Sequence, residues 1–213
     1  MKMTAKFHLP GLRYNYPFKY DASQLKEKYP HYFQDNIEIA SFFGEFPTSL
    51  WNGGRFSNGD QCDRRFVEEV VKSINTRGIP VRYTYTNPLL TEEDLADAYC
   101  NFCMKTADNG KNEVLVVSPI LEAYIRKNYP GFTINSSTCK EIRGIEGVNE
   151  ELKKDYGLVV LDYNLNNQFG ELQKITDKSR CELLVNACCI PECPRRGEHY
   201  RTIAKQQRIT LKN

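Results

Sequence analysis

The sequence lacks the motifs by which common enzyme classes are recognised. It contains no Gly-x-Ser-x-Gly nucleophile motif, no His-Glu-x-x-His zinc motif and no phosphate-binding loop. The Cys-x3-Cys-x2-Cys motif of radical-SAM enzymes is also missing, and the 213 residues include only three histidines. Serine hydrolases, zinc peptidases and nucleotide-dependent enzymes of the familiar types are therefore not indicated.

Long apolar segments are missing too. No apolar run approaches the roughly 20 residues that a membrane-spanning helix needs. Residues 1–10 lack the continuous apolar core of a signal peptide, so we expect neither export nor a membrane partner. The net charge of +2 is too small to indicate nucleic acid by itself. A content of 40% hydrophobic and 26% charged residues is typical of a globular protein.

Cysteine, in contrast, is abundant, with eight residues and no export signal. In a reducing cytosol such thiols more often bind metal, take part in catalysis or pack in the core than form disulfides. We therefore expect a cytoplasmic protein. Because exposed thiols and clusters oxidise, this composition also favours an anaerobic setting.

Short apolar strands alternate with amphipathic helices from Ile37 to the end of the chain. Because the strands are nearly continuous in apolar residues, the alternation indicates a parallel sheet covered by helices. A TIM-type barrel and an open doubly wound sheet both fit this pattern. The predicted strands lie at 37–43, 81–86, 114–117, 132–135, 157–161 and 183–185, and the helices near 63–75, 91–102, 119–129, 148–156, 169–175 and 198–207.

Six such units are too few for a full barrel, which has eight units and usually takes about 250 residues. We therefore predict a TIM-like barrel that is incomplete, is completed by a partner protein or a second copy, or belongs to a longer chain. Residues 1–36, rich in Tyr, Phe and Pro without a clear period, are expected to form an N-terminal cap segment. Residues 37–213 form the barrel-like part of a single domain, since no linker is evident.

Three thiols follow the last predicted strand within six residues. Cys188, Cys189 and Cys193 lie in a loop that two prolines prevent from continuing as strand or helix. Iron–sulfur clusters and structural zinc both take thiolates, usually four, so we predict that these three are metal ligands. Cys139, after the fourth predicted strand, is the candidate for the fourth ligand. The alternative is that all four thiols are small buried apolar side chains.

Other cysteines are assigned to packing. Cys100 and Cys103 have the spacing of a ligand pair, but they fall inside a predicted helix beside Tyr99 and Phe102 on its apolar face. We therefore expect a structural role for both.

Polar residues follow the predicted strands, where the sites of parallel α/β proteins lie. Asn52 and Arg55, in a Gly-Gly loop, together with Asn87 and Asn164, are predicted to line a substrate site. Glycines allow close backbone approach to a ligand, and arginine binds carboxylate or phosphate with two parallel hydrogen bonds. The weak catalytic candidates are Glu45, as a general acid or base, Arg55 and Asn164. A Gly-Gly turn with solvated charges is the alternative.

Arg195 and Arg196 follow the thiols directly. Two arginines beside a cluster would offset its negative charge, bind an acidic substrate or contact RNA phosphates. His199, close behind, is a further candidate ligand or acid–base group. The alternative is that all three belong to the solvated start of a helix, which we favour for His199.

Several consecutive segments share an order and spacing with a known family. They are the strand at 114–119, the helix at 120–130 and the strand at 132–138, which ends in Ser136-Ser137-Thr138. Residues 159–165 and 182–189 stand where that family has V-V-L-S/A-R-E-L and E-x-F-V-H-G-A-L-C strands. Over about residues 37–200 the chain thus resembles the collagenase-like peptidase family U32, as a short and divergent member.

The departures from the family pattern bear on function. Tyr163 and Asn164 stand where the family has Arg-Glu, and Asn186 and Ala187 where it has His-Gly. Peptidase activity is therefore poorly supported. The resemblance implies a TIM-like barrel and, from several members, a 4Fe-4S cluster on four cysteines that serves oxygen-independent hydroxylation of a ubiquinone precursor or tRNA.

The expected function is therefore an iron–sulfur protein, a redox or hydroxylation factor that acts on a small molecule or RNA. Zinc is the alternative to the cluster. The alternative functions are a non-catalytic, metal-stabilised binding protein and a peptidase-like hydrolase with a cysteine nucleophile.

Overall fold

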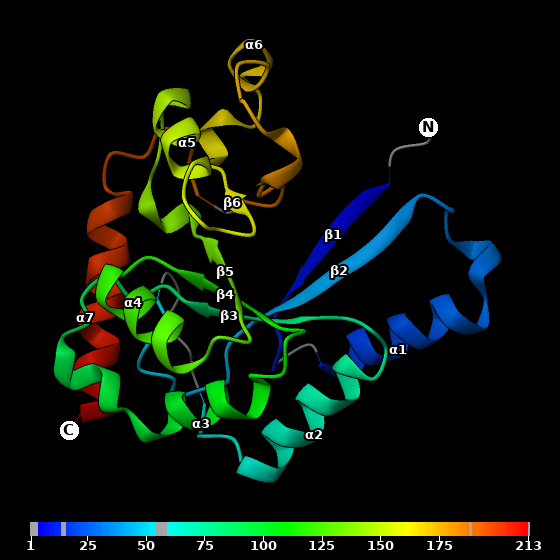
Figure 1. Cartoon of the computed structure of the whole chain (residues 1–213), viewed down its shortest axis with the longest axis vertical. Coiled ribbons are helices and arrows are strands. Elements are labelled where there is room, and N and C mark those ends of the chain that lie inside the picture. The colour runs from blue at the N-terminus through cyan, green and yellow to red at the C-terminus, as the bar shows by residue number, and fades with distance from the viewer. Residues whose placement is uncertain (1–3, 14–15, 54–58, 188, 213) are drawn as a thin grey trace.

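The centre of the protein is a seven-stranded parallel sheet, curved into an incomplete TIM-like barrel (Figure 1). The structure is a computed structural model that describes residues 4–13, 16–53, 59–187 and 189–212. Each strand pairs in parallel with the next in the chain, as expected when a helix returns the chain after each strand. The strands are β1 (Ala5–Pro10), β2 (Ile37–Gly44), β3 (Val81–Tyr85), β4 (Glu113–Val116), β5 (Thr133–Ser136), β6 (Val159–Val160) and β7 (Cys181–Glu182).

Helices α2 to α7 lie in the predicted places, with shifted ends, and α1 lies in the N-terminal segment, which was expected to cap the barrel. They are α1 (Tyr16–Lys28), α2 (Arg64–Asn75), α3 (Ala98–Ala107), α4 (Pro119–Asn128), α5 (Ile145–Leu152), α6 (Phe169–Leu172) and α7 (Arg196–Lys212). Single 3-10 turns are η1 (Pro30–Tyr32), η2 (Glu92–Ala96), η3 (Thr138–Lys140), η4 (Tyr163–Leu165) and η5 (Lys178–Arg180). Asp63 caps α2 by accepting a hydrogen bond from the Arg65 amide, and Thr91 with Asp94 forms the capping box of η2.

Two of the predicted strand assignments are wrong. The sheet has a seventh strand, β1, in the segment expected only to cap the barrel, and it pairs with β2. The last strand is Cys181–Glu182 rather than 183–185. Because β6 has only two residues, β7 has a partner for only two, and the apolar run after it leaves the sheet. Leu183 and Val185 are 42% and 75% exposed.

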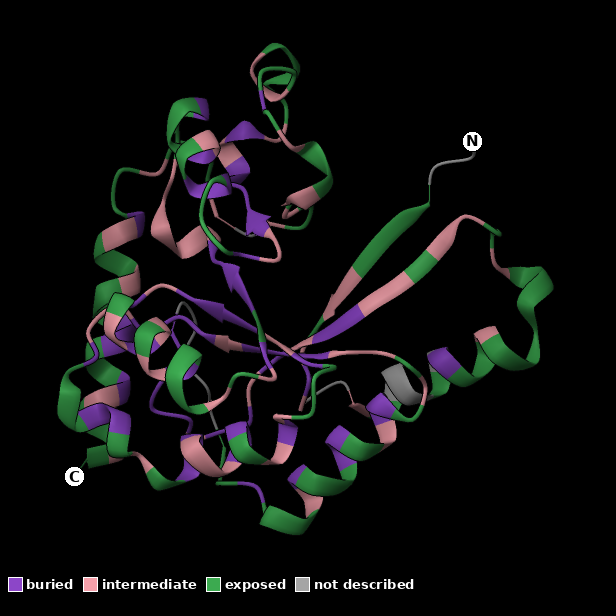
Figure 2. Cartoon of the chain, viewed as in Figure 1, coloured by how far each residue is buried: buried purple, intermediate pink, exposed green. Residues whose placement is uncertain are grey.

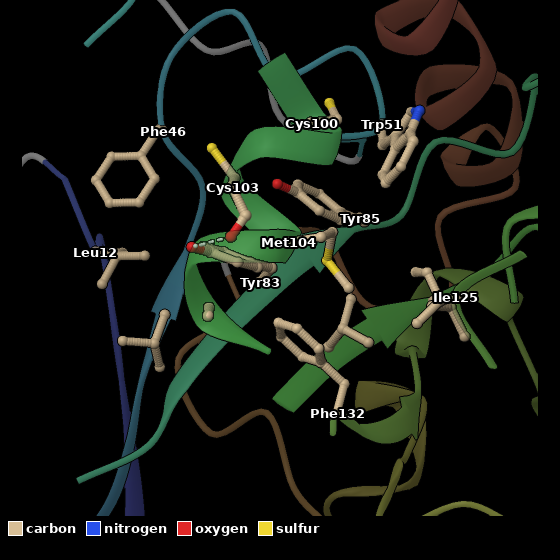
Figure 3. Close-up of a cluster of buried hydrophobic side chains, with 14 of the residues drawn as sticks. Leu12, Phe46, Trp51, Tyr83, Tyr85, Cys100, Cys103, Met104, Ile125 and Phe132 are labelled. Atoms are coloured by element: carbon tan, nitrogen blue, oxygen red, sulfur yellow. Dashed lines mark hydrogen bonds between the residues drawn. The ribbon is translucent and has the colours of Figure 1, made fainter. Parts of the chain in front are cut away.

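The main core lies between the outer face of the sheet and helices α2, α3 and α4. Alternate residues of β3 point outward, so Tyr83 and Tyr85 stack on each other and contact α3, where the Tyr83 hydroxyl donates to the Cys103 carbonyl (Figure 3). Cys100 and Cys103 are fully buried in this cluster, which confirms the packing role expected for them. Figure 2 shows the buried strands of the sheet and the exposed outer part of β1.

The inner face of the sheet carries charge instead. Arg82 of β3 has a fully buried side chain that pairs with Glu113 of β4 and with Glu182 of β7, at 2.5 Å each. His8 of β1 lies 3.5 Å from the same Glu182 carboxylate. The two edge strands of the open sheet therefore meet through side chains inside the barrel, and Arg82 is the cation that joins them.

His8 is held neutral inside this charged layer. Its Nε2 lies 3.4 Å from a guanidinium nitrogen of Arg82 and its Nδ1 lies 2.7 Å from the Ser41 hydroxyl. Since arginine only donates, Nε2 is the acceptor and Nδ1 carries the proton. Burial, and then the positive charge of Arg82, lower the pKa of His8 to about 4.

We expect His8 to make the fold sensitive to mild acid. The unfolded chain takes up a proton on this histidine near pH 6.5 and the folded chain only near pH 4, so stability falls as the pH drops between these values. From pH 7 to pH 5 the loss is about 2 kcal/mol. Urea unfolding of the wild type and of His8→Gln at both pH values measures it, with the exposed His31→Gln as control. An equal pH dependence in the wild type and His8→Gln would contradict the assignment.

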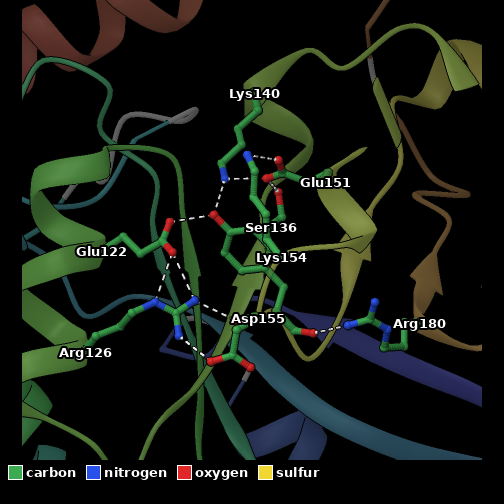
Figure 4. A network of polar contacts seen from close by, with 9 residues as sticks. Glu122, Arg126, Ser136, Lys140, Glu151, Lys154, Asp155 and Arg180 are labelled. Atoms are coloured by element: carbon green, nitrogen blue, oxygen red, sulfur yellow. Dashed lines mark hydrogen bonds and ion pairs between the residues drawn. The ribbon is translucent and has the colours of Figure 1, made fainter. Parts of the chain in front are cut away.

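A polar network fixes α5 against the sheet and α4. The carboxylate of Glu151 accepts from the Ser136 hydroxyl of β5 and from Lys140 and Lys154 (Figure 4). Lys140 also reaches the Tyr156 hydroxyl, which donates to Glu122 of α4 at 2.6 Å. Burial opposes ionisation of Glu151, but its three donors lower its pKa to about 2.

Among the described residues, no helix is both long and apolar enough to cross a membrane.

Candidate site at the carboxyl ends of the strands

Helix α7 brings together side chains that follow different strands. Cys139 lies in η3, directly after β5, and its amide donates to the hydroxyl of Ser137. Burial raises the pKa of Tyr200 of α7, and the Cys139 and Cys189 thiols raise it further, whereas the charge of Arg196 lowers it. Two of the four predicted metal ligands therefore act electrostatically on one tyrosine, from turns that follow β5 and β7.

The Cys139 thiol is kept in its neutral form. Burial raises its pKa, and hydrogen bonding to Ser137, Tyr200 and Thr86 together with the charge of Arg196 only partly offsets this. A neutral, covered thiol is a poor nucleophile at neutral pH. The hydrolase alternative therefore gains no support from Cys139.

Arg196 forms the most buried ion pair of this region. Its guanidinium donates to both carboxylate oxygens of Asp162, which follows β6, and lies 3.5 Å from the Glu141 carboxylate. It also stacks 4.4 Å from the centre of the Tyr163 ring. Burial disfavours the charged guanidinium, but the bonds to Asp162 outweigh it and raise the pKa of Arg196. The neighbouring Arg195 is exposed and pairs with Glu198. His199 is exposed as well.

The loop after β2 provides a second polar group. The Thr84 hydroxyl of β3 donates to Glu45 at 3.1 Å and lies 3.5 Å from the side-chain oxygen of Asn52. Gly53 packs so tightly on the next loop that a Cβ there would lie 2.3 Å from the Thr86 carbonyl oxygen. This glycine is therefore required by backbone packing. Arg55, the predicted anion clamp, lies outside the described residues.

Asn87 and Asn164 hold loops together. Asn87 is fully buried; its amide donates to the Leu50 carbonyl and its oxygen accepts from the Leu89 amide. The side-chain oxygen of Asn164 accepts from the Glu192 amide, which attaches the thiol loop to η4. The buried Nδ2 of Asn164 has no hydrogen-bond partner within the described part of the chain.

A backbone carbonyl of the thiol loop is bound by a side chain of η4. The Tyr163 hydroxyl donates to the Ile190 carbonyl, which also accepts from the Cys193 amide at 3.3 Å. Cys188, a predicted ligand, lies outside the described residues. In the ranges that the structure describes, no three His, Cys, Asp or Glu side chains are grouped as a metal site.

Sequence reasoning missed Tyr200 and the pairing of Arg196 with Asp162. Asp162 directly follows the strand predicted at 157–161, but its partner lies 34 residues away. A signal for Tyr200 was present, because residues four apart on a helix share a face and Arg196 precedes it by four.

Comparison with solved structures identifies the architecture. The structure of the U32 peptidase Mk0906 superposes on 99% of this chain and on 80% of its own, with a TM-score of 0.61 and 14% sequence identity. The chain has the fold of a U32 peptidase. The predicted resemblance is thereby confirmed as a likeness of fold.

Sequence comparison adds one similar protein. Over 106 residues, the chain is 26% identical to the uncharacterized protease MJ1657 of Methanocaldococcus jannaschii. This match covers 48% of the present chain and 31% of that protein, so it spans about a third of the relative's length. No model of a known protein family matches the chain.

Proposed function

We propose that this protein is a short, divergent U32-like protein that binds a metal centre, an iron–sulfur cluster, through thiols at the carboxyl ends of its strands. The observation that carries the proposal is that Cys139 lies in the turn directly after β5, while Tyr163 and Asn164 attach the thiol loop to the turn after β6, so both groups lie at the carboxyl ends of strands. The U32-like fold supports it, because some members of that family carry such a cluster.

The donor set fits a cluster in its chemistry. Cys139, Cys188, Cys189 and Cys193 together make the four thiols that clusters take. The described thiols are not already gathered at ligand distances. Binding would therefore draw the loop at 188–193 toward Cys139, and the cluster would supply electron-transfer or substrate-binding chemistry there. Within this proposal the protein is a redox or hydroxylation factor for a small molecule or RNA.

A second candidate is a zinc-stabilised, non-catalytic binding protein. It rests on the same four thiols, because structural zinc sites take four thiolate or imidazole ligands and need no open position for a substrate.

Metal content of anaerobically purified protein tests both candidates. We expect about four iron and four sulfide per chain, with visible charge-transfer absorbance. The double variant Cys139→Ser, Cys189→Ser should lose both. Cys181→Ser is the matched control, because Cys181 packs on the outer cluster around α5 and should leave metal binding unchanged. A zinc stoichiometry that the double variant loses would favour the second candidate. Folded wild-type protein without any metal would refute both.

A further inference from the structure

Helix α7 spans the face of the barrel on which the candidate site lies. Its side chains contact the loop after β2 through Gln207 and the segment after β3 through Arg208. At the other end, Arg196 reaches Glu141, after β5, and Asp162, after β6. In parallel α/β proteins this face is where ligands enter. A ligand approaching Cys139 along the barrel axis therefore meets α7 first.

The contacts that hold α7 are mostly polar. Gln207 donates to the Ser49 carbonyl at 2.6 Å and Arg208 to the Leu89 carbonyl at 3.0 Å. The buried apolar contribution is small: Ile203 and Ala204 are buried and Leu211 is partly buried against the core, whereas Ile209 is 53% exposed. Water replaces polar contacts at little cost, so this interface separates more easily than an apolar one of the same size.

Asp94 clamps the C-terminal end of α7 through two ion pairs. This fully buried carboxylate pairs with Arg208 at 3.2 Å and with Lys212. Burial opposes the charge of Asp94, but hydrogen bonds from Lys212 and Thr91 lower its pKa. The two cations remain partly exposed, and solvent screens such pairs.

The N-terminal end of α7 is held by a buried ion pair. Arg196 and Asp162 are both buried in their pair, and Gly197 packs closely on Glu141, where an added Cβ would lie 2.4 Å from a carboxylate oxygen. Breaking a buried pair costs more than breaking a partly exposed one. The helix is therefore fixed at Arg196 and releasable at Arg208 and Lys212.

We propose that α7 is a reversible cover of the carboxyl face, clamped by Asp94 and hinged at the Arg196 end. Release of the clamp lets the helix swing away and opens the partly exposed Cys139 and the Ser49 loop to a ligand. The proposal depends on the candidate site only for the site's position, and it holds with or without bound metal.

The test removes the clamp from the α7 side. The variant Arg208→Gln, Lys212→Gln leaves Asp94 in place, and Arg201→Gln, Lys205→Gln is the matched control, with the same charge change at exposed positions of the same helix. Two observables are measured on the full chain: hydrogen exchange of α7 peptides, and the iodoacetamide labelling rate of each cysteine by peptide mass spectrometry, with and without a chelator.

We expect the clamp variant to speed exchange of α7 and labelling of Cys139 about tenfold, which corresponds to about 1.4 kcal/mol. The core thiols Cys100 and Cys103 and the matched control should keep wild-type rates. Unchanged labelling of Cys139 in the chelator-treated clamp variant would overturn the proposal, as would equal acceleration at all cysteines, which reports unfolding. The exchange rates do not depend on metal, so a failure of the proposed function is distinguished from a failure of the cover.

Discussion

Arg82→Met is expected to destabilise the protein by about 3–5 kcal/mol, because it removes a fully buried cation that two largely buried carboxylates share. Glu113 and Glu182 are 17% and 14% exposed in their side chains, and each lies 2.5 Å from the Arg82 guanidinium. Methionine fills much of the same volume but leaves both negative charges in the barrel interior.

Urea unfolding at pH 7 measures this loss, and two further variants locate its cause. Arg65→Met removes an arginine whose side chain is 85% exposed and which pairs only with Glu69, so it should change stability by less than about 0.5 kcal/mol. Adding Glu113→Gln and Glu182→Gln to Arg82→Met should restore most of the loss, because no unpaired charge then remains. A loss below about 1 kcal/mol for Arg82→Met would show that the charged layer does not hold the edge strands together.

The sequence predicts the strands that carry a local signal, but it does not predict the long-range contacts of the charged layer. Continuous apolar strands such as 114–117 indicate burial on both faces, and they were placed correctly. Strand β1 alternates Lys6 and His8 with Phe7 and Leu9, a period-2 signal that was present but short and exposed, so it was read as a cap. Arg82 looked like any strand arginine. Its partners come from β4 and from β7, 31 and 100 residues away, and no local pattern encodes them.

The prediction of the last strand was wrong for the opposite reason. Leu183, Leu184 and Val185 have the composition of a buried strand, yet the residues that pair with β6 are Cys181 and Glu182, which precede them. Two tertiary constraints set this pairing: β6 is short, and Arg82 pairs with Glu182 as its second carboxylate. The thiol loop therefore begins earlier than predicted. Cys139 lies in η3, which follows β5 directly.

Arg195 and Arg196 are adjacent in the sequence but lie in different environments. Arg195 and Arg196 were predicted together as substrate-binding residues, since nothing in the sequence distinguishes them. In the structure Arg195 is 80% exposed, whereas Arg196 is buried on Asp162. Helical geometry turns adjacent side chains about 100° apart, so only one of the two reaches the carboxyl face.

We expect Arg196→Met to cost about 3–5 kcal/mol and Arg195→Met less than about 0.5 kcal/mol. The two variants make the same charge change at adjacent positions, which makes each the control of the other. Loss of the guanidinium leaves Asp162 buried without a cation, and Asp162 also caps η4 by accepting from the Asn164 amide. The damage should therefore spread to the attachment of the thiol loop, which hydrogen exchange of residues 189–195 detects.

Arg196→Lys separates charge from geometry in the same site. Lysine restores a positive charge but cannot donate to both oxygens of Asp162 or stack on Tyr163 as the planar guanidinium does. It should recover part of the stability and leave exchange of the thiol loop faster than in the wild type. Equal destabilisation by Arg195→Met and Arg196→Met would mean that the buried pair does not anchor α7. In that case the hinge of the proposed cover would have to lie elsewhere.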